Sequence, residues 1–305
     1  MATFAKSSFD SAIYATFRPT YPRSLFDFIF RYHELNKGAR WDRAVDLGCG
    51  TGQATVELTP FKSVIGVDPS SKMIEIAQST LKNTPANTGQ YEYAQASAEN
   101  LTFLEDSSVD LVISAQACHW FDWNKMWPEL ARVLKRNGSV AFWGYSQLRF
   151  ARYPSLTPRI NAYVEGTDPL NSIGPYWEQP GRSILDNHLI EVPDGNEVVP
   201  GALSNFERVF FTGDYYPSLP SPRSVIMRKK MTWDGLLSYF NTWSALHTFH
   251  QHNPTDGENP HGDVAVRFWK DLKDRVEQED GRVVEGHDEV DIEWPLAVVM
   301  AKRAQ

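Results

Sequence analysis

Residues 45–52 read Val-Asp-Leu-Gly-Cys-Gly-Thr-Gly, and this stretch decides the fold. It ends one short apolar run, and a second run, Ser63-Val-Ile-Gly-Val67, ends in Asp68. Glycines after a buried strand let the backbone approach a ligand, and the start of a following helix presents free N–H groups. An acid at the tip of the next parallel strand is placed to accept hydrogen bonds from a ribose diol. The two segments together predict a site for a nucleoside-containing cofactor.

The spacing of the glycines indicates which cofactor is bound. Dinucleotide-binding folds use the spacing G-x-G-x-x-G, whereas Gly48, Gly50 and Gly52 follow Asp46 in the form D-x-G-x-G-x-G. This form resembles motif I of the class I S-adenosylmethionine (SAM) methyltransferases. The resemblance implies that Asp46, Gly48 and Gly50 surround the methionine part of SAM and that Asp68 takes the ribose hydroxyls. A glycine-rich turn in another α/β protein is the alternative, and the correctly spaced Asp68 favours the methyltransferase.

Length, charge and composition exclude several classes of protein. The chain has 305 residues and a formal net charge of -8, which gives no support to nucleic-acid binding because phosphate contacts need clustered Lys and Arg. No apolar run is long enough to predict a membrane-spanning helix, and the first residues lack an apolar signal segment. Cys49 and Cys118 do not form a disulfide framework. We therefore expect a cytoplasmic protein without a membrane or nucleic-acid partner, and the oligomeric state stays open.

Strands and helices alternate over the first half of the chain. Short apolar runs predict strands at 44–47, 64–67, 91–95, 109–115 and 139–144. Helices are predicted at 21–32, after the glycine loop, from Ser70 onward, and over a stripe from Met126 that Asn137-Gly138 ends. In the second half, strands are predicted at 206–211 and 290–300, with Pro295 at an edge, bulge or end, and helices at 232–247 and 264–276.

This order predicts an α/β fold with right-handed crossovers. We expect a Rossmann-like class I methyltransferase sheet, mostly parallel with a late antiparallel strand, that carries a discontinuous helical cap. Such sheets bind ligands beyond the carboxyl ends of their strands, so the cap would cover the reaction site. The expected parts are a SAM-binding core with an N-terminal lid segment at 1–146, cap insertions at 147–205 and 213–288, and core strands at 206–212 and 289–305.

Two further segments match the methyltransferase pattern. Ala96-Ser-Ala-Glu-Asn-Leu101 stands where these enzymes read the adenine, and Ser97 replaces the acid that is common there. The resemblance therefore assigns adenine recognition to the Ala98 backbone, Glu99 or water. Gln116 marks the tip of the fourth strand near the methionine end, and His119-Trp120 follows where methyl donor and acceptor would meet. Packing at the strand end is an equally open interpretation of His119 and Trp120.

The N-terminal stretch Tyr14-Ala-Thr-Phe-Arg-Pro-Thr-Tyr-Pro22 resembles a segment that closes over the cofactor in related small-molecule methyltransferases. The resemblance implies that Tyr14 and Arg18 contact SAM, and Arg18 would pair with a carboxylate of the cofactor or of the acceptor. Ordinary docking of the N-terminus with Arg18 at the surface is the alternative. Met73 is expected at the cofactor edge or in the core.

The predicted cap carries the information on the acceptor. Its segments Ile173-Gly-Pro-Tyr-Trp-Glu-Gln-Pro-Gly-Arg182 and Asn241-Thr-Trp-Ser-Ala-Leu-His247 resemble the fungal-type trans-aconitate methyltransferase group, and the resemblance runs from Phe9 to the last strand. It implies a small-molecule carboxylic acid as the acceptor and a methyl ester as the product. The expected substrate-binding residues are Tyr176, Trp177, Arg182, Arg228, Trp243 and His247, and the expected catalytic residues are His119, Trp120 and Tyr145. For each arginine, a surface or structural ion pair is the alternative.

A carboxylate is already a nucleophile at neutral pH, so the sequence predicts in-line methyl transfer by proximity and desolvation without a strong general base. Two other functions stay open: O- or C-methylation of another small secondary metabolite, and SAM binding without methylation. His247, His250, His252 and His261 fit no standard ligand spacing, so no metal is expected.

Overall fold

The computed structural model describes residues 18–35, 37–82 and 89–304. The described chain forms two compact units, and neither of them is a continuous segment. One unit contains Thr20–Ser146, Pro180–Ile226 and 296–304. The other contains 18–19, Gln147–Gln179 and Met227–Pro295.

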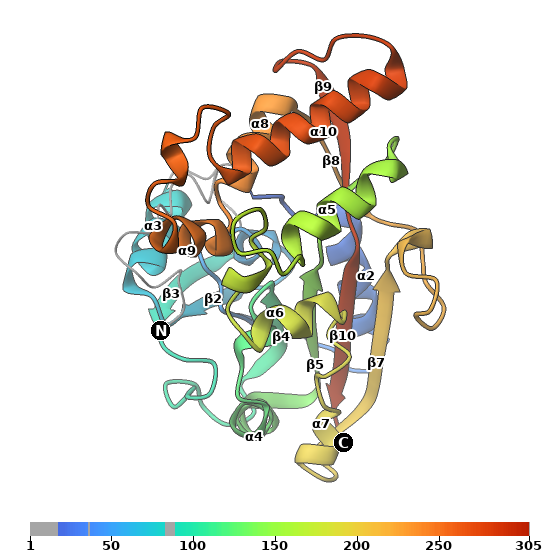
Figure 1. The fold of residues 1–305 in the computed structure, drawn as a ribbon. Coiled ribbons are helices and arrows are strands. Elements are labelled where there is room, and N and C mark those ends of the chain that lie inside the picture. The colour runs from blue at the N-terminus through green and yellow to red at the C-terminus, as the bar shows by residue number, and fades with distance from the viewer. Residues whose placement is uncertain (1–17, 36, 83–88, 305) are drawn as a thin grey trace. The chain divides into compact units, whose positions relative to one another are not determined.

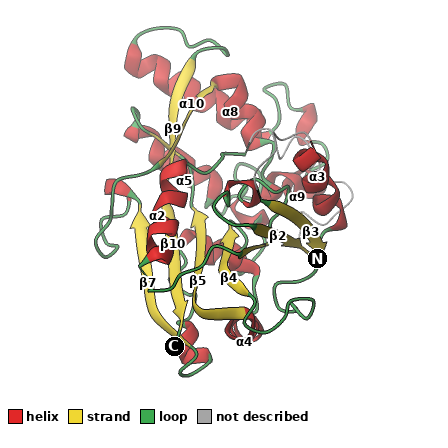
Figure 2. Cartoon of the chain, turned by 180° about the vertical axis from the view of Figure 1, so that it is seen from behind, coloured by secondary structure: helices red, strands yellow, loops and turns green. Residues whose placement is uncertain are grey.

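The first unit is built on a seven-stranded sheet with the order β3-β2-β1-β4-β5-β10-β7 (Figure 1). Its strands from β1 to β5 pair in parallel, and β10 is antiparallel to both β5 and β7. Figure 2 shows β10 between these two neighbours from behind. The predicted mostly parallel sheet with a late antiparallel strand is therefore confirmed. The strands are β1 (Arg43–Leu47), β2 (Ser63–Asp68), β3 (Gln90–Gln95), β4 (Val109–Ala115), β5 (Leu134–Tyr145), β7 (Leu203–Phe211) and β10 (Leu296–Arg303).

Amphipathic helices connect these strands. In α2 (Arg23–Glu34), Leu25 and Ile29 are fully buried at the helical spacing that the sequence predicts, and Phe26 is fully buried as well. The other α-helices of this unit are α3 (Ser71–Lys82), α4 (Trp123–Val133), α6 (Gly181–Asp186) and α7 (Gly195–Val198). Short 3-10 turns in the chain are η2 (Thr55–Glu57), η3 (Cys118–Trp120), η4 (Pro154–Leu156), η5 (Gly174–Tyr176), η6 (Gly213–Tyr215) and η7 (Asp256–Glu258).

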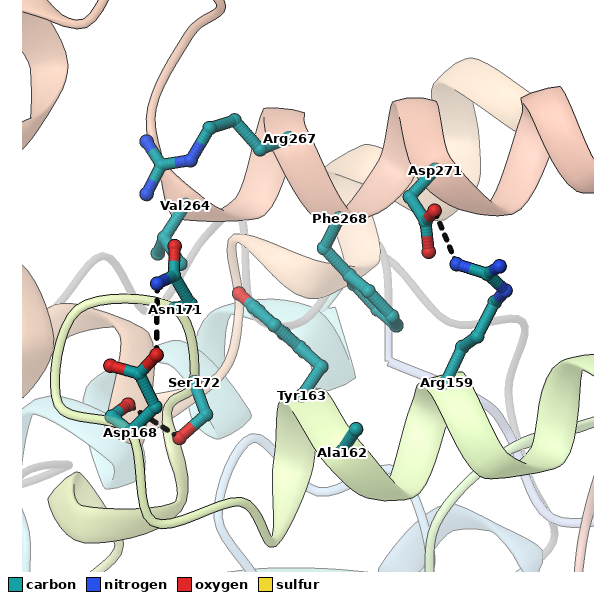
Figure 3. A pocket seen from close by; sticks show the side chains of 10 residues that line it. All are labelled: Arg159, Ala162, Tyr163, Asp168, Asn171, Ser172, Val264, Arg267, Phe268 and Asp271. Atoms are coloured by element: carbon teal, nitrogen blue, oxygen red, sulfur yellow. Dashed lines mark hydrogen bonds and ion pairs between the residues drawn. The ribbon is translucent and has the colours of Figure 1, made fainter.

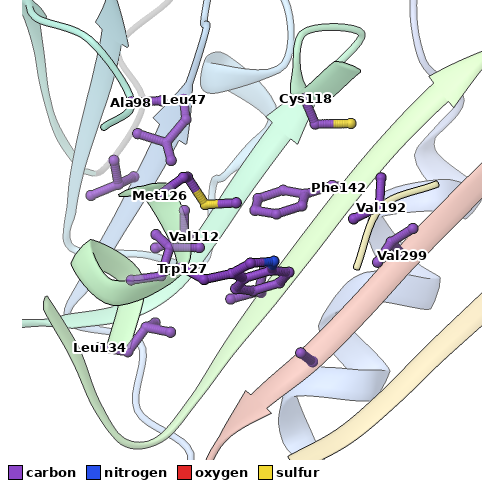
Figure 4. Close-up of a cluster of buried hydrophobic side chains, with 14 of the residues drawn as sticks. Leu47, Ala98, Val112, Cys118, Met126, Trp127, Leu134, Phe142, Val192 and Val299 are labelled. Carbon is purple, nitrogen blue, oxygen red and sulfur yellow. The ribbon is translucent and has the colours of Figure 1, made fainter. Parts of the chain in front are cut away.

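The core of the first unit lies between α4 and the sheet. Figure 4 shows Met126 and Trp127 of α4 reaching toward Phe142 of β5. The ring centroids of Trp127 and Phe142 are 5.8 Å apart, and both side chains are fully buried. Gly195 of α7 leaves room for the Trp127 ring, because a Cβ there would lie 2.9 Å from Cε3 of Trp127. The core therefore fixes α4 and α7 beneath the strands that carry the site.

The second unit has a three-stranded antiparallel sheet with the order β6-β9-β8. Phe150 of this sheet stacks on Trp233 at 5.6 Å between ring centroids, and the indole N–H of Trp269 donates to the Trp233 carbonyl at 2.7 Å. Its strands are β6 (Arg149–Phe150), β8 (Met227–Thr232) and β9 (Glu289–Trp294), and its α-helices are α5 (Thr157–Val164), α8 (Trp233–Phe240), α9 (Ser244–His252) and α10 (Val264–Asp280).

Two of the predicted helices are wrong in extent. The glycine loop is followed only by the single turn η2, because Pro60 lacks an amide hydrogen and disfavours helical dihedrals at Thr59. The stripe from Met126 ends at Val133, not at Asn137-Gly138. Beyond it, Leu134 is fully buried in strand β5, and Lys135 lies 3.0 Å from the Asp110 carboxylate.

Two predictions concern single elements that the structure divides. The helix predicted at 232–247 is two helices, α8 and α9, because the Thr242 hydroxyl donates to the Tyr239 carbonyl at 2.6 Å and buried Trp243 adopts extended dihedrals. The strand predicted at 290–300 is β9 and β10 in two different sheets. Pro295 separates them, so its predicted place at a strand end is confirmed. None of the described helices combines the length and apolar character needed to cross a membrane.

Truncation of Trp127 to alanine should lower the free energy of unfolding by about 3–5 kcal/mol, because it empties a fully buried volume beside Phe142. Denaturant titration followed by circular dichroism measures this change. Phe103→Ala is the control, since the Phe103 side chain is 47% exposed and its loss should change stability by less than about 0.5 kcal/mol. Equal losses in the two variants would contradict this description of the core.

Candidate cofactor and acceptor site

The glycine loop after β1 is folded by backbone conformations that favour glycine. Gly48, Gly50 and Gly52 have positive φ angles of 68°, 53° and 86°. The amides of Gly48 and Cys49 both donate to the Val67 carbonyl, at 2.7 and 3.0 Å, which ties the loop to the end of β2. A Cβ on Gly48 would lie 2.4 Å from Cβ of Ala117, whereas one on Gly50 would meet no heavy atom within 4 Å. The loop is thus packed at Gly48 and open at Gly50.

Asp68, at the end of β2, is 9% exposed. Its Oδ2 accepts from the Gly50 amide and its Oδ1 from the Ser70 amide, each at 2.9 Å. Burial raises the pKa of this carboxyl, and the two backbone hydrogen bonds oppose that rise. A carboxylate oxygen accepts more than one hydrogen bond, so both oxygens retain capacity for the hydroxyls of a ribose.

Asp46, at the end of β1, is fully buried. Its Oδ2 accepts from the Thr55 hydroxyl at 2.7 Å, and its Oδ1 has no hydrogen-bond partner. Burial raises the pKa of Asp46 to about 7, the Thr55 hydrogen bond opposes the rise, and the negative charge of Asp68 adds to it. An unpartnered buried carboxylate oxygen is costly unless a cationic group reaches it. Asp46 beside an open glycine loop therefore fits the ammonium group of an amino-acid cofactor.

The segment after β3 is organised around Glu99. The Ser97 hydroxyl donates to the Glu99 carboxylate, and the Glu99 amide donates back to Ser97 Oγ at 3.1 Å. The other carboxylate oxygen of Glu99 accepts from the Asp122 amide at 3.0 Å. Ala98, which stands between Ser97 and Glu99 in the chain, is buried. Met73 of α3 is also buried. Ser97 thus orients Glu99, which carries the carboxylate of this segment.

Gln116 links the tip of β4 to the end of β5. It has a positive φ of 56°, and its side-chain amide both donates to the Tyr145 carbonyl at 3.1 Å and accepts from the Tyr145 amide at 2.7 Å. The side chain of Tyr145 is buried. The structure therefore brings these two predicted residues together through the backbone of Tyr145.

His119, Trp120 and Arg182 lie together beyond the end of β4. His119 is buried with no partner on Nδ1, and burial, helped by the nearby charge of Arg182, lowers its pKa to about 3. Trp120 is 37% exposed and covers Gly181, where a Cβ would lie 2.6 Å from Cζ3 of the indole. The Nε of Arg182 lies 2.8 Å from Asp186 Oδ2. This corner thus combines a neutral imidazole, an indole and a mostly buried guanidinium.

Two partners in this unit were missed by sequence reasoning. Thr55 holds Asp46, and Asp186 holds Arg182. The spacing of Asp186, four residues after Arg182 within α6, is a signal that was available for that pair. Thr55 gives no such signal, because its contact with Asp46 depends on how the loop folds back.

The other predicted site residues belong to the second unit, except Tyr14, which lies outside the described residues. Arg18 donates to the Thr242 carbonyl at 3.1 Å and lies over the Tyr239 ring at 5.7 Å. Arg228 of β8 pairs with Glu293 of β9 at 2.9 Å, and its side chain is 62% exposed. His247 lies 3.1 Å from the side-chain amide of Gln251.

Three predicted aromatic residues of the second unit are held by that unit's own structure. The Tyr176 hydroxyl donates to the Pro169 carbonyl at 2.9 Å, and the Trp177 indole donates to the Val164 carbonyl at 2.9 Å. Trp243 is buried, with its ring centroid 6.1 Å from that of Trp177. Each of these rings therefore helps to pack the unit, whatever else it contacts.

A separate pocket of about 470 Å³ lies within the second unit (Figure 3). Tyr163 stacks on Phe268 there, with ring centroids 3.9 Å apart. Arg159 is paired with Asp271, and the Asn171 amide donates to Asp168. The pocket contains none of the predicted site residues, and its remaining cation, Arg267, pairs with Asp256 at 2.9 Å. Among the described residues, no group of three or more His, Cys, Asp or Glu side chains could hold a metal ion.

The strand order, the glycine loop after β1 and the acid at the end of β2 define a Rossmann-like protein for a nucleoside cofactor. A family described as "Methyltransferase domain" matches residues 45–142. The Saccharomyces cerevisiae protein named "Probable S-adenosylmethionine-dependent methyltransferase CRG1" is 30% identical over 311 residues, which cover 99% of this chain and 99% of that protein. A Claviceps purpurea protein named "Methyltransferase" is 32% identical over 330 residues, which cover 99% and 94%. The chain therefore belongs to the S-adenosylmethionine-dependent methyltransferases.

The fold agrees with this family. A solved structure from Anaeromyxobacter dehalogenans that carries the name of a type II methyltransferase has a TM-score of 0.65 and 25% sequence identity, and it covers 94% of this chain and 98% of its own. The protein is a SAM-dependent methyltransferase with the class I fold, and SAM is its cofactor. Asp46, with its unpartnered Oδ1, and Asp68 fit two polar parts of that cofactor, its ammonium group and its ribose.

The affinity for S-adenosylhomocysteine should rise with pH up to about pH 7. Below the pKa of Asp46, about 7, the carboxyl of the empty protein holds a proton, and this proton must leave before the carboxylate can bind an ammonium group. Because binding requires the loss of this proton, the affinity falls by up to about tenfold for each pH unit below that value. Calorimetric titration over this range measures the effect.

Asp46→Asn is the control for this pH dependence. The amide cannot ionise, so its affinity should be lower at neutral pH and nearly independent of pH on the acid side. An acid-side decline of equal slope in both proteins would assign the proton to another group, such as Asp68.

Proposed function

We propose that this methyltransferase transfers the methyl group to a carboxylate of a small-molecule acid, of the trans-aconitate kind, and forms a methyl ester. The observation that carries this proposal is the pair of His119 and Arg182 beyond the end of β4. With a pKa of about 3, His119 is a neutral and very weak base at physiological pH. An acceptor that is already anionic needs no base, and a guanidinium beside the imidazole favours an anion.

The chemistry follows from an in-line displacement at carbon. SAM supplies a methyl group on a positively charged sulfur. A carboxylate oxygen of the acceptor gives the electron pair for the new O–CH₃ bond, the S–CH₃ bond breaks, and its electron pair stays on sulfur. No proton moves in this step. The protein's contribution is to hold the acceptor in line and to exclude water, and orientation of this kind supplies roughly 7–11 kcal/mol.

Arg182 is proposed to bind a carboxylate that does not react, because a guanidinium on the reacting oxygen would lower its nucleophilicity. Asp186 supports this role, since it holds Nε of Arg182 and so orients the planar group. Trp120 and Tyr145 are proposed as walls of the acceptor site.

A methyl-transfer screen with radiolabelled SAM across di- and tricarboxylic acids tests the proposed function. We expect a product that mild alkali hydrolyses, since esters are cleaved and ethers and C-methyl products are not. A labelled product that resists alkali would instead indicate O- or C-methylation of another small metabolite.

Replacement of Arg182 by alanine should raise KM for the acid acceptor about tenfold or more and leave the dissociation constant of S-adenosylhomocysteine unchanged, because a charged hydrogen bond to the acceptor is lost. Steady-state kinetics and calorimetry separate the two effects. Arg23→Ala is the matched control, because Arg23 pairs with Asp27 at the same i,i+4 spacing on the exposed face of α2. Unchanged acceptor kinetics in Arg182→Ala would remove this arginine from the site.

A further inference from the structure

We propose that Thr55 is a positioning residue for the cofactor: its hydroxyl fixes the Asp46 carboxylate so that Oδ1 is left for the cofactor's ammonium group, and it thereby sets the pH range in which the enzyme binds SAM. The proposal rests on SAM as the cofactor and is independent of the acceptor. Its geometric basis is a single hydrogen bond of 2.7 Å between Thr55 Oγ1 and Asp46 Oδ2, with both residues fully buried.

The loop itself holds Thr55 in place. Thr55 begins the turn η2, where the Val56 amide donates to the Gly52 carbonyl at 3.2 Å and the Leu58 amide donates to the Thr55 carbonyl at 3.2 Å. A branched Cβ leaves the side chain few rotamers, so the hydroxyl has little freedom to leave Asp46. The glycine loop therefore brings its own hydrogen-bond donor back to the acid that precedes it.

The other groups around Asp46 do not supply a donor or a positive charge. Asp68 from β2 is acidic and disfavours a second negative charge. Cys49 from the loop and Tyr93 from β3 are the other titratable groups that interact with Asp46, and the pKa of each is raised, chiefly by burial. On the β4 side, Asp46 pairs with apolar Ile113. Among the described residues, the Thr55 hydroxyl is therefore the one hydrogen-bond donor to the Asp46 carboxylate.

The position of the pKa of Asp46 makes this hydrogen bond important. The carboxyl must be ionised to bind an ammonium group, and that occurs above about pH 7 in this protein. The α-amino group of the cofactor is protonated at neutral pH, so its charge does not limit binding on the acid side. The ionisation of Asp46 therefore sets the acid limit of the pH range for binding. Loss of the Thr55 hydroxyl would raise the pKa of Asp46 further and move this limit to higher pH.

Calorimetric titration of S-adenosylhomocysteine from about pH 5.5 to about pH 8.5 tests the proposal in Thr55→Val and Thr55→Ser. We expect the acid-side decline in affinity of Thr55→Val to move to higher pH by about one unit, which means roughly fivefold weaker binding at pH 7 and about tenfold weaker binding well below it. Thr55→Ser keeps the hydroxyl, so its affinity should fall on the acid side at the same pH as that of the wild type. Thr212→Val is the matched control, because Thr212 is fully buried in the same unit and does not contact Asp46.

Three outcomes overturn the proposal: an unchanged acid-side decline in Thr55→Val, equal weakening at every pH with the same midpoint, or the same shift in Thr212→Val. If Thr55→Val does not fold, Thr55→Ala removes the hydroxyl with a smaller side chain. The pH midpoint of the acid-side decline in affinity is then compared between Thr55→Ala and the wild type. A readout without cofactor is the thermal stability of the empty protein. A raised pKa of Asp46 makes stability decrease as pH rises toward that pKa, and this decrease should extend to higher pH in Thr55→Val and be absent in Asp46→Asn.

Discussion

The hydrogen bond from the Gly50 amide to the Asp68 carboxylate is the contact on which the rest of the site depends. It joins the loop that follows β1 to the acid that ends β2, while the amides of Gly48 and Cys49 bind the Val67 carbonyl of the same strand. Because three backbone amides point at one strand end, the loop cannot move as a free segment. Asp46 precedes this loop and Thr55 follows it, and the negative charge of Asp68 helps to raise the pKa of Asp46.

Much of the fold could be predicted because its information is local. Apolar runs followed by glycines or acids mark the parallel strands, and helical spacing marks α2 correctly. The errors occur where distant contacts decide. Whether residues 232–247 form one helix or two depends on the Thr242 hydroxyl and on the burial of Trp243, which a helical repeat does not reveal. After the glycine loop, Pro60 limits the chain to the single turn η2, so a local signal that opposes a helix is present in the sequence there.

In the candidate site, too, the residues given by a local motif could be predicted, whereas their contact partners could not. Asp46, Asp68 and Gln116 were found from a motif, because a motif records which residue type stands at a strand end. A motif does not record partners, so the contacts of Asp46 with Thr55 and of Arg182 with Asp186 emerged only from the folded chain. Gln116 shows the limit most clearly, since both polar atoms of its side chain bind the Tyr145 backbone. Aromatic residues such as Trp177 are recognisable as a cluster, yet their sequence cannot distinguish packing from ligand contact.

The division of the last apolar segment at Pro295 has a consequence for how the chain becomes native during synthesis. β9 is the middle strand of the three-stranded sheet, and β10 lies between β5 and β7 of the seven-stranded sheet. Each sheet therefore lacks an interior strand until residues 289–303 have left the ribosome. Before that moment β5 and β7 have no shared neighbour, and apolar side chains such as Phe142 and Phe210 lack part of their cover. Fifteen consecutive residues, divided by one proline, thus complete both sheets, so a chain interrupted at residue 288 would lack the middle strand of one sheet and the strand between β5 and β7 in the other.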